Sequence, residues 1–138
     1  MSKLPDCCYR VSIKALILNE TRNKFLVSKD HGYWDLPGGG VSHGTVATEE
    51  LAREIKEEMG LAVTWIDSKP SYFATGVQTL NPEVPMASVI YECELEHLDF
   101  TPSEECTDIM FVSPDEINSL PVFDAVKKLA VIFRKENH

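Results

Sequence analysis

Long apolar runs are missing from this sequence of 138 residues. A membrane-spanning helix needs about 20 predominantly apolar residues, whereas the longest runs here are Ala15–Leu18 and Leu129–Phe133. The N-terminal stretch Met-Ser-Lys-Leu-Pro-Asp also lacks the apolar segment of a signal peptide. These absences argue against a secreted or membrane-inserted protein, and they predict a soluble, cytoplasmic protein with no membrane partner.

Basic residues are scarce relative to acidic ones. The chain has 13 Lys and Arg against 22 Asp and Glu, which gives a formal net charge of −9. Nucleic-acid binding needs clustered Lys and Arg, so this composition predicts no nucleic-acid partner. If the substrate is itself an anion, something must offset the repulsion, and divalent cations are the obvious candidate.

Cysteine occurs four times but never as a C-x-x-C pair. A secreted disulfide framework and a zinc site are therefore both disfavoured, since the four histidines show no ligand spacing either. The length and the ordinary composition predict one domain over residues 1–138, which is large enough to fold around its own core.

The hydrophobic pattern predicts more strands than helices. The expected strands are 8–18, 24–28, 62–67, 71–79, 86–96 and 107–112, and the expected helices are 46–59, 113–119 and 123–135. The first two strands look like a hairpin, and 81–85 is expected to be a turn. The glycine-rich segment 33–40 is not expected to form a regular element. This order indicates an α/β layered domain with a mixed sheet between helices.

The helix expected at 46–59 concentrates the chemistry. At about 100° per residue, three carboxylates share one of its faces: Glu54, Glu57 and Glu58. The adjoining stripe is apolar: Leu51, Ile55 and Met59. Like charges at this spacing repel one another, and a hard divalent cation such as Mg²⁺ would offset the repulsion. A solvated acidic face, or pairing of Arg53 with a nearby glutamate, is the alternative interpretation.

The glycine triplet favours the metal interpretation because of where it lies. By itself it indicates only a turn. Here it precedes the acidic helix in one loop–helix unit, and backbone groups of such loops coordinate ions or donate to phosphate oxygens.

The spacing of loop and helix follows a known pattern. Gly39 is followed at a fixed distance by the run Arg53-Glu-Ile-Lys-Glu-Glu-Met-Gly-Leu61. This arrangement resembles the signature of the Nudix hydrolase family, G-x5-E-x7-R-E-U-x-E-E-x-G-U, where U is aliphatic. Eight of the nine specified positions agree, and the exception is Thr45, where the family has glutamate. The preceding Trp34-Asp-Leu-Pro-Gly-Gly is similar to the family's lead-in.

The resemblance implies a fold and a reaction. The fold would be α/β, a Nudix-like α/β/α sandwich with a mixed β-sheet. The reaction would be metal-dependent hydrolysis of the diphosphate linkage of a nucleoside diphosphate derivative, with water attacking phosphorus. The cofactor would be Mg²⁺ or Mn²⁺, which accept similar oxygen ligands, and the partner a small-molecule substrate. Many relatives are dimers, so a homodimer is a further expectation, although the sequence reveals no interface.

Site residues can be carried over position by position. The resemblance assigns metal binding to Glu54, Glu57 and Glu58, and to the backbone carbonyl of Gly38. Arg53 matches the arginine that orients these glutamates through ion pairs.

The general base is expected to be Glu54. Glu105, or its neighbours Glu104 and Asp108 in the acidic loop, could supply it instead. A plain solvated turn is the alternative interpretation of that loop.

Substrate contacts are expected from Gly39 and from three further side chains. Trp34 would stack on a base, and Lys14 or Lys29 would meet a phosphate. Core packing or surface charge is the alternative for each of the three. No downstream subfamily motif identifies the substrate.

Thr45 is shorter and neutral, whereas the family's glutamate helps to hold the arginine and the loop. Threonine is a fair N-cap, so Thr45 is expected to cap the helix instead, with activity retained. The alternative is a nucleotide-binding sensor or regulator on a Nudix fold, with weak or no catalysis. An isomerase would need a cysteine in the cleft, and Cys93 and Cys106 lie in no such context. An interaction module would require the agreements to be accidental.

Overall fold

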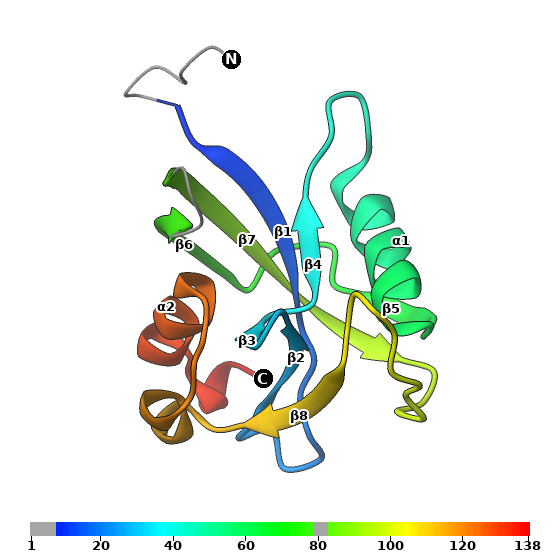
Figure 1. Cartoon of the computed structure of the whole chain (residues 1–138), viewed down its shortest axis with the longest axis vertical. Coiled ribbons are helices and arrows are strands. Elements are labelled where there is room, and N and C mark those ends of the chain that lie inside the picture. The colour runs from blue at the N-terminus through cyan, green and yellow to red at the C-terminus, as the bar shows by residue number, and fades with distance from the viewer. Residues whose placement is uncertain (1–7, 79–82) are drawn as a thin grey trace.

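The chain forms two β-sheets flanked by helices (Figure 1). The structure, a computed structural model, describes residues 8–78 and 83–138, so the turn predicted at 81–85 lies partly outside the described residues. The strands are β1 (Arg10–Leu16), β2 (Phe25–Asp30), β3 (Tyr33–Asp35), β4 (Gly38–Gly40), β5 (Val63–Ile66), β6 (Tyr72–Gln78), β7 (Val84–Leu95) and β8 (Asp108–Val112). The helices are α1 (Ala47–Met59), α2 (Asp124–Ile132) and the 3₁₀ helices η1 (Pro114–Ser119) and η2 (Lys135–Asn137).

The larger sheet is mixed. Its strand order is β4-β1-β7-β5, and β6 also pairs with β7. β1 and β7 run parallel, whereas β4, β5 and β6 are antiparallel to their partners. The smaller sheet, β3-β2-β8, is antiparallel. Because α1 and α2 lie on opposite sides of the sheets (Figure 1), the predicted α/β sandwich with a mixed sheet is confirmed.

Each long helix buries its apolar side in a separate core. α1 packs its predicted stripe against residues of β1, including Ile13 and Ala15. The stripe residues are all buried: Leu51, Ile55 and Met59. α2 contributes Val126 and Leu129 to the other core, together with Phe25 of β2. Full burial of one such side chain contributes about 1.5–3 kcal/mol, so these stripes hold α1 and α2 in fixed positions.

The hairpin predicted for residues 8–28 is wrong beyond its turn. The turn forms, and the side chain of Asn19 accepts hydrogen bonds from the backbone N–H groups of Asn23 and Lys24. After the bridge between Leu18 and Phe25, however, the two strands belong to different sheets. The reason is that β1 is buried along most of its length, on both faces, and takes a central position beside the parallel strand β7.

The prediction that residues 33–40 form no regular element is also wrong. They contain β3 and the edge strand β4, which pairs with β1. β4 approaches β1 closely because Gly38, at a φ of 133°, has no side chain; a Cβ there would overlap the carbonyl oxygen of Ile13. Hydrogen bonds to β1 involve Pro37 and Val41. In an alternating antiparallel ladder, the N–H and C=O of Gly38 therefore face away from β1.

Two helix ends differ from the predictions. Val46, whose side chain cannot accept a hydrogen bond, takes the N-cap position of α1, and the hydroxyl of Thr45 donates to the carbonyl oxygen of Ser42. The expected cap by Thr45 is therefore wrong. α2 ends at Ile132 rather than at 135, because Phe133 adopts an extended conformation and packs into the core. No helix in residues 8–78 and 83–138 is long and apolar enough to cross a membrane.

Candidate active site

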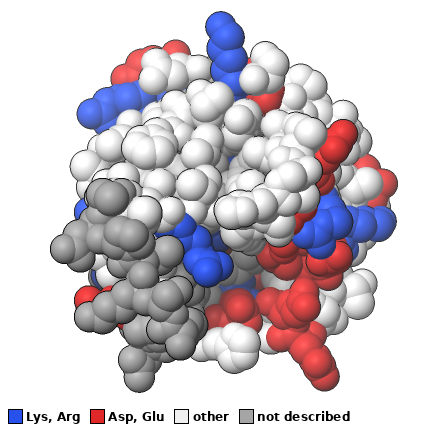
Figure 2. All heavy atoms as spheres, turned by 90° about the horizontal axis from the view of Figure 1, so that it is seen from above, with Lys and Arg blue, Asp and Glu red and all other residues white. Residues whose placement is uncertain are grey.

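Four glutamates line a cavity of about 350 Å³. Glu54, Glu57 and Glu58 come from α1, Glu105 comes from the loop before β8, and Gly38 of β4 forms part of the same wall. We call this the glutamate cavity. In Figure 2, acidic side chains gather on one side of the face seen from above, with basic side chains directly beside them. The fold thus brings together all the residues that were predicted as metal ligands.

The carboxyl group of Glu58 is strongly perturbed. Burial is the main reason that the pKa of Glu58 rises to about 7, and the charge of Glu54 acts in the same direction. The ammonium of Lys14 and the backbone N–H of Gly38 act in the opposite direction. Burial therefore makes the ionised form of Glu58 costly, and a bound cation would offset that cost.

Arg53 links three carboxylates on α1. Its Nη1 donates to Oε1 of Glu57 at 2.7 Å, and its Nη2 donates to Oε1 of Glu50 at 2.7 Å and to Oε1 of Glu54 at 3.2 Å. The bonds to Glu50 and Glu57 raise the pKa of Arg53 above its ordinary value. The predicted pairing of Arg53 with nearby glutamates is confirmed.

The cavity offers oxygen donors without a finished coordination site. Within residues 8–78 and 83–138, no three acidic, histidine or cysteine side chains are grouped closely enough to hold an ion as they stand. One reason is that Arg53 holds Glu54 and Glu57. The donor types nevertheless fit a hard divalent cation, since carboxylates and a backbone carbonyl line the same wall.

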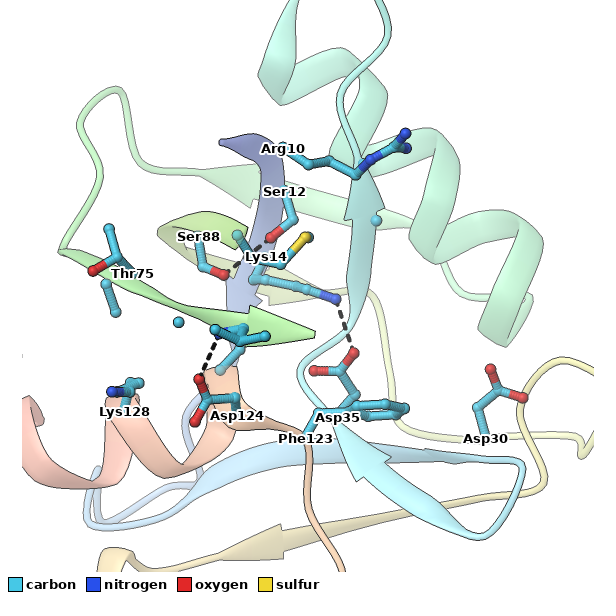
Figure 3. A pocket seen from close by; sticks show the side chains of 17 residues that line it. Arg10, Ser12, Lys14, Asp30, Asp35, Thr75, Ser88, Phe123, Asp124 and Lys128 are labelled. Atoms are coloured by element: carbon cyan, nitrogen blue, oxygen red, sulfur yellow. Dashed lines mark hydrogen bonds and ion pairs between the residues drawn. The ribbon is translucent and has the colours of Figure 1, made fainter. Parts of the chain in front are cut away.

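A second cavity of about 290 Å³ lies between the larger sheet and the start of α2 (Figure 3). We call it the sheet cavity. Three residues line both cavities, which therefore adjoin: Asp30, Asp35 and Phe123. The other residues that line the sheet cavity come from β1, β4, β6, β7 and α2: Arg10, Ser12, Lys14, Gly39, Gly40, Ala74, Thr75, Gly76, Val77, Met86, Ser88, Asp124, Ala125 and Lys128.

Two carboxylates are fixed at the wall of the sheet cavity. Figure 3 shows Lys14 reaching toward Asp35, and the distance between Lys14 Nζ and Asp35 Oδ2 is 3.0 Å. Asp124, at the start of α2, accepts a hydrogen bond from the N–H of Val77 at 2.9 Å. Its carboxylate lies so close to Gly76 that a Cβ at this position would overlap Oδ2. Asp124 therefore joins α2 to β6 while facing the cavity.

The predicted substrate residues separate into two groups. Lys14 and Gly39 line the sheet cavity. The ring of Trp34 is only 6% exposed and belongs to the core, and Lys29 Nζ lies 5.6 Å from its centroid. Side chains alternate along β3, so Asp35 faces the cavities and Trp34 faces the opposite way. The prediction that Trp34 stacks on a base is therefore wrong, and Lys29 is not retained as a phosphate contact.

Sequence reasoning missed Asp35 and Asp124. Asp35 would have followed from the alternative interpretation of Trp34 as a core residue in a strand, because alternation then places Asp35 on the opposite face. Asp124 carries no comparable signal, since an acidic residue in the first turn of a helix is common for reasons of the helix dipole. In the acidic loop, Glu105 is the one of the three candidates that lines the glutamate cavity among the described residues.

Comparison with known proteins decides the family. A model of the NUDIX domain matches residues 9–134. The chain belongs to the NUDIX family. This Nudix enzyme is a pyrophosphohydrolase, a hydrolase of acid anhydrides in phosphorus-containing compounds.

Two curated relatives are named nucleoside triphosphatase NudI. The protein from Enterobacter sp. (strain 638) is 30% identical over 102 residues, which cover 70% of this chain and 72% of the relative. The protein from Escherichia coli O81 (strain ED1a) is 32% identical over 92 residues, which cover 62% of this chain and 65% of the relative.

Solved structures share the fold of the Nudix enzyme. The MutT protein from Methanosarcina mazei Go1 has a TM-score of 0.75 at 24% identity and covers 97% of this chain and 99% of its own. The MutT NUDIX hydrolase from Burkholderia pseudomallei has a TM-score of 0.74 at 19% identity, and the match covers 92% of this chain and 99% of the Burkholderia chain. These likenesses extend over both sheets and both long helices.

Proposed function

We propose that this Nudix enzyme hydrolyses a nucleoside triphosphate, with the nucleoside in the sheet cavity and the phosphates over the glutamate cavity. The observation that carries this proposal is that the two cavities adjoin along Asp30, Asp35 and Phe123. One cavity offers polar groups to a nucleoside, and the other offers carboxylates for a metal-bound phosphate. The nucleoside triphosphatase names of the two relatives support the same substrate class.

The metal would be held by α1 and β4. Glu54, Glu57 and Glu58 would supply carboxylate oxygens, and Gly38 would supply its carbonyl, which faces away from β1. When Mg²⁺ or Mn²⁺ is bound there, it neutralises phosphate charge, orients the attacking water and lowers the pKa of that water. A metal between the enzyme and its substrate also suits an acidic chain, whose net charge of −9 would otherwise repel a triphosphate.

Lys14 is the proposed phosphate contact between the two cavities. It is 7% exposed and donates to Asp35 at 3.0 Å and to the carbonyl oxygen of Leu36 at 3.4 Å. A buried ammonium group needs anionic or carbonyl partners. Since Asp35 lines both cavities, it holds Lys14 where a phosphate oxygen can become a further partner.

Glu54 is the proposed general base. Arg53 occupies its Oε1, so Oε2 is the oxygen that would take the proton from the attacking water. Glu105 is the alternative, because it reaches the same cavity from a different loop. Replacing each by glutamine separates the two: loss of the base lowers turnover and removes the lower pKa from the pH–rate profile, whereas loss of the other residue leaves that pKa in place.

The test of the function is metal-dependent release of a nucleoside monophosphate. The purified chain is incubated with the four ribonucleoside and four deoxyribonucleoside triphosphates, with Mg²⁺, with Mn²⁺ and with a chelator. Nucleotide sugars, ADP-ribose and dinucleoside polyphosphates serve as competing substrate classes. Faster turnover of one of these classes than of every triphosphate would contradict the proposal.

A nucleotide-binding sensor is the second candidate, and two observations favour it. Thr45 replaces the family's glutamate, and Arg53 holds two of the proposed metal ligands. Nucleotide binding in calorimetry without turnover on any substrate would support this candidate. Thr45→Glu would then be expected to restore turnover.

A further inference from the structure

Glu50 stands out among the three partners of Arg53 because it is buried. Its side chain is 6% exposed, compared with 23% for Glu54 and 55% for Glu57. Its Oε1 accepts the 2.7 Å hydrogen bond from Nη2 of Arg53, and the hydroxyl of Ser42 lies 3.5 Å from the same oxygen. A buried carboxylate is costly unless it is paired, so the position of Glu50 is tightly tied to that of Arg53.

Glu50 does not reach the reacting groups. Among the described residues that line the glutamate cavity, Glu54 and Glu57 are present and Glu50 is not. Any effect of Glu50 on the cavity must therefore pass through Arg53. That path is short, since Nη2 of Arg53 bonds both Glu50 and Glu54, and Nη1 bonds Glu57.

The loop before α1 explains why position 45 has no such role in this chain. Thr45 is neutral and exposed, and its hydroxyl is used within the loop, where it donates to the carbonyl oxygen of Ser42. Ser42 thus contacts Thr45 through its carbonyl and Glu50 through its hydroxyl. The carboxylate that anchors Nη2 of Arg53 from the start of the helix is that of Glu50, in the first turn of α1.

We propose that Glu50 is a positioning residue for the metal-binding face of α1: it anchors the guanidinium of Arg53, which in turn limits the positions of Glu54 and Glu57. This inference rests on the proposed metal-dependent hydrolysis at the same cavity. Glu50 replaces the missing carboxylate at position 45, so the departure at Thr45 leaves the arginine anchored.

The experiment compares Glu50→Gln with Glu49→Gln. Both remove one negative charge from the first turn of α1, but Glu49 is exposed and forms no ion pair within the described chain. Mn²⁺ binding is measured by calorimetry without substrate, and kcat and KM are measured with the best triphosphate. Removing a group that orients a metal ligand typically lowers metal affinity or activity by about 10–100-fold. For Glu50→Gln we expect a loss of that size in Mn²⁺ affinity and in kcat, whereas KM should stay within about twofold of the parental value. For Glu49→Gln we expect all three quantities to equal those of the parent chain.

Rescue provides the second arm. The double variant Thr45→Glu, Glu50→Gln restores a carboxylate beside Ser42, and we expect it to recover most of the lost Mn²⁺ affinity and kcat. Equal Mn²⁺ affinities for Glu50→Gln and Glu49→Gln would overturn the proposal, and so would a loss that the double variant does not reduce. If Glu50→Gln does not fold, Glu50→Asp replaces it. Aspartate keeps the charge but shortens the reach, and an unchanged Mn²⁺ affinity in that variant would also overturn the proposal.

Failure of the proposed function can be recognised separately. Mn²⁺ binding needs no substrate, so it tests the link between Glu50 and the metal-binding face even if no nucleotide is hydrolysed. If the parent chain binds Mn²⁺ and Glu50→Gln weakens that binding, but neither chain hydrolyses any substrate, the positioning role stands and the proposed hydrolysis is contradicted. If the parent chain hydrolyses a triphosphate and Glu50→Gln changes neither turnover nor Mn²⁺ affinity, the proposed hydrolysis stands and the positioning role is contradicted.

Discussion

Two polar clusters in this molecule are built from similar groups. On α1, Arg53 is half-exposed and contacts three carboxylates beside the glutamate cavity. Beyond α2, the side chain of His138 is 2% exposed, with Nδ1 2.7 Å from Oε1 of Glu92 and Nε2 2.8 Å from the hydroxyl of Tyr72. Its ring also stacks on Phe133. The His138 cluster satisfies its polar groups internally, as the interior of a protein requires.

The difference between the clusters is the balance of charge. In the His138 cluster, one carboxylate, Glu92, accepts from the imidazole and lies 3.6 Å from Arg22. In the Arg53 cluster, one arginine serves three glutamates, and Glu58 lies nearby with a raised pKa. Unbalanced charge at a cavity wall costs stability unless a ligand offsets it, so it indicates a functional site. Mutations should therefore lower activity in one cluster and stability in the other.

The largest effect is expected from removing two carboxylates of the glutamate cavity. Glu57→Gln combined with Glu58→Gln should lower kcat by about a thousandfold or more, because a bound metal contributes several kcal/mol to the transition state. Steady-state turnover of the best triphosphate measures this. The matched control is Glu92→Gln in the His138 cluster, which should leave kcat within about threefold. An equal loss of kcat in both variants would remove the distinction between the clusters.

The pH dependence of stability should sharpen the same comparison. The pKa of Glu58 is about 7 in the folded chain against an ordinary 4.5, so folding favours its protonated form. This contribution is fully present below about pH 4.5 and is lost as pH rises through 7. A shift of this size corresponds to about 3 kcal/mol. In chelator at pH 8, Glu58→Gln should therefore be more stable than the parent chain by up to about 3 kcal/mol, with little difference at pH 4.5.

Urea unfolding of both chains at the two pH values measures that prediction. The outcome that contradicts it is a difference between the chains that does not change with pH. Adding Mg²⁺ at pH 8 should reverse the order, because a metal stabilises the parent carboxylate and not the amide.

A smaller loss of stability is expected in the His138 cluster. His138→Ala leaves the partly buried carboxylate of Glu92 and the hydroxyl of Tyr72 with one partner fewer each, which should cost about 1–3 kcal/mol. The midpoint of urea unfolding measures it, and kcat of the folded variant should stay close to the parental value. A large loss of kcat without a loss of stability would place His138 in the function and not in the scaffold.

The sequence predicted the glutamate site better than its surroundings, for physical reasons. Glu54, Glu57 and Glu58 lie on one helix, and helical geometry alone fixes which of them share a face. The error about Trp34 has a different origin, because only the pairing of β3 shows which way its side chains point. The hairpin error is of the same kind: a local turn was recognisable, but the separation of β1 and β2 depends on the distant strand β7. The burial of Glu50 was not predictable for a similar reason, since it depends on the loop before α1.

The smallest effect concerns the base of the substrate and the sheet cavity. Asp124 uses Oδ2 to accept from Val77, so Oδ1 is available to accept from an exocyclic amino group of a bound base. A single hydrogen bond contributes about 0.5–1.5 kcal/mol, so kcat/KM for CTP should exceed that for UTP by about two- to tenfold. Asp124→Asn keeps an acceptor for Val77 but also offers a donor, and it should bring the two substrates within about twofold. Asp115→Asn, outside both cavities among the described residues, is the control. An unchanged ratio in Asp124→Asn would restrict Asp124 to holding α2 against β6, and base selection would then have to come from other residues of the sheet cavity.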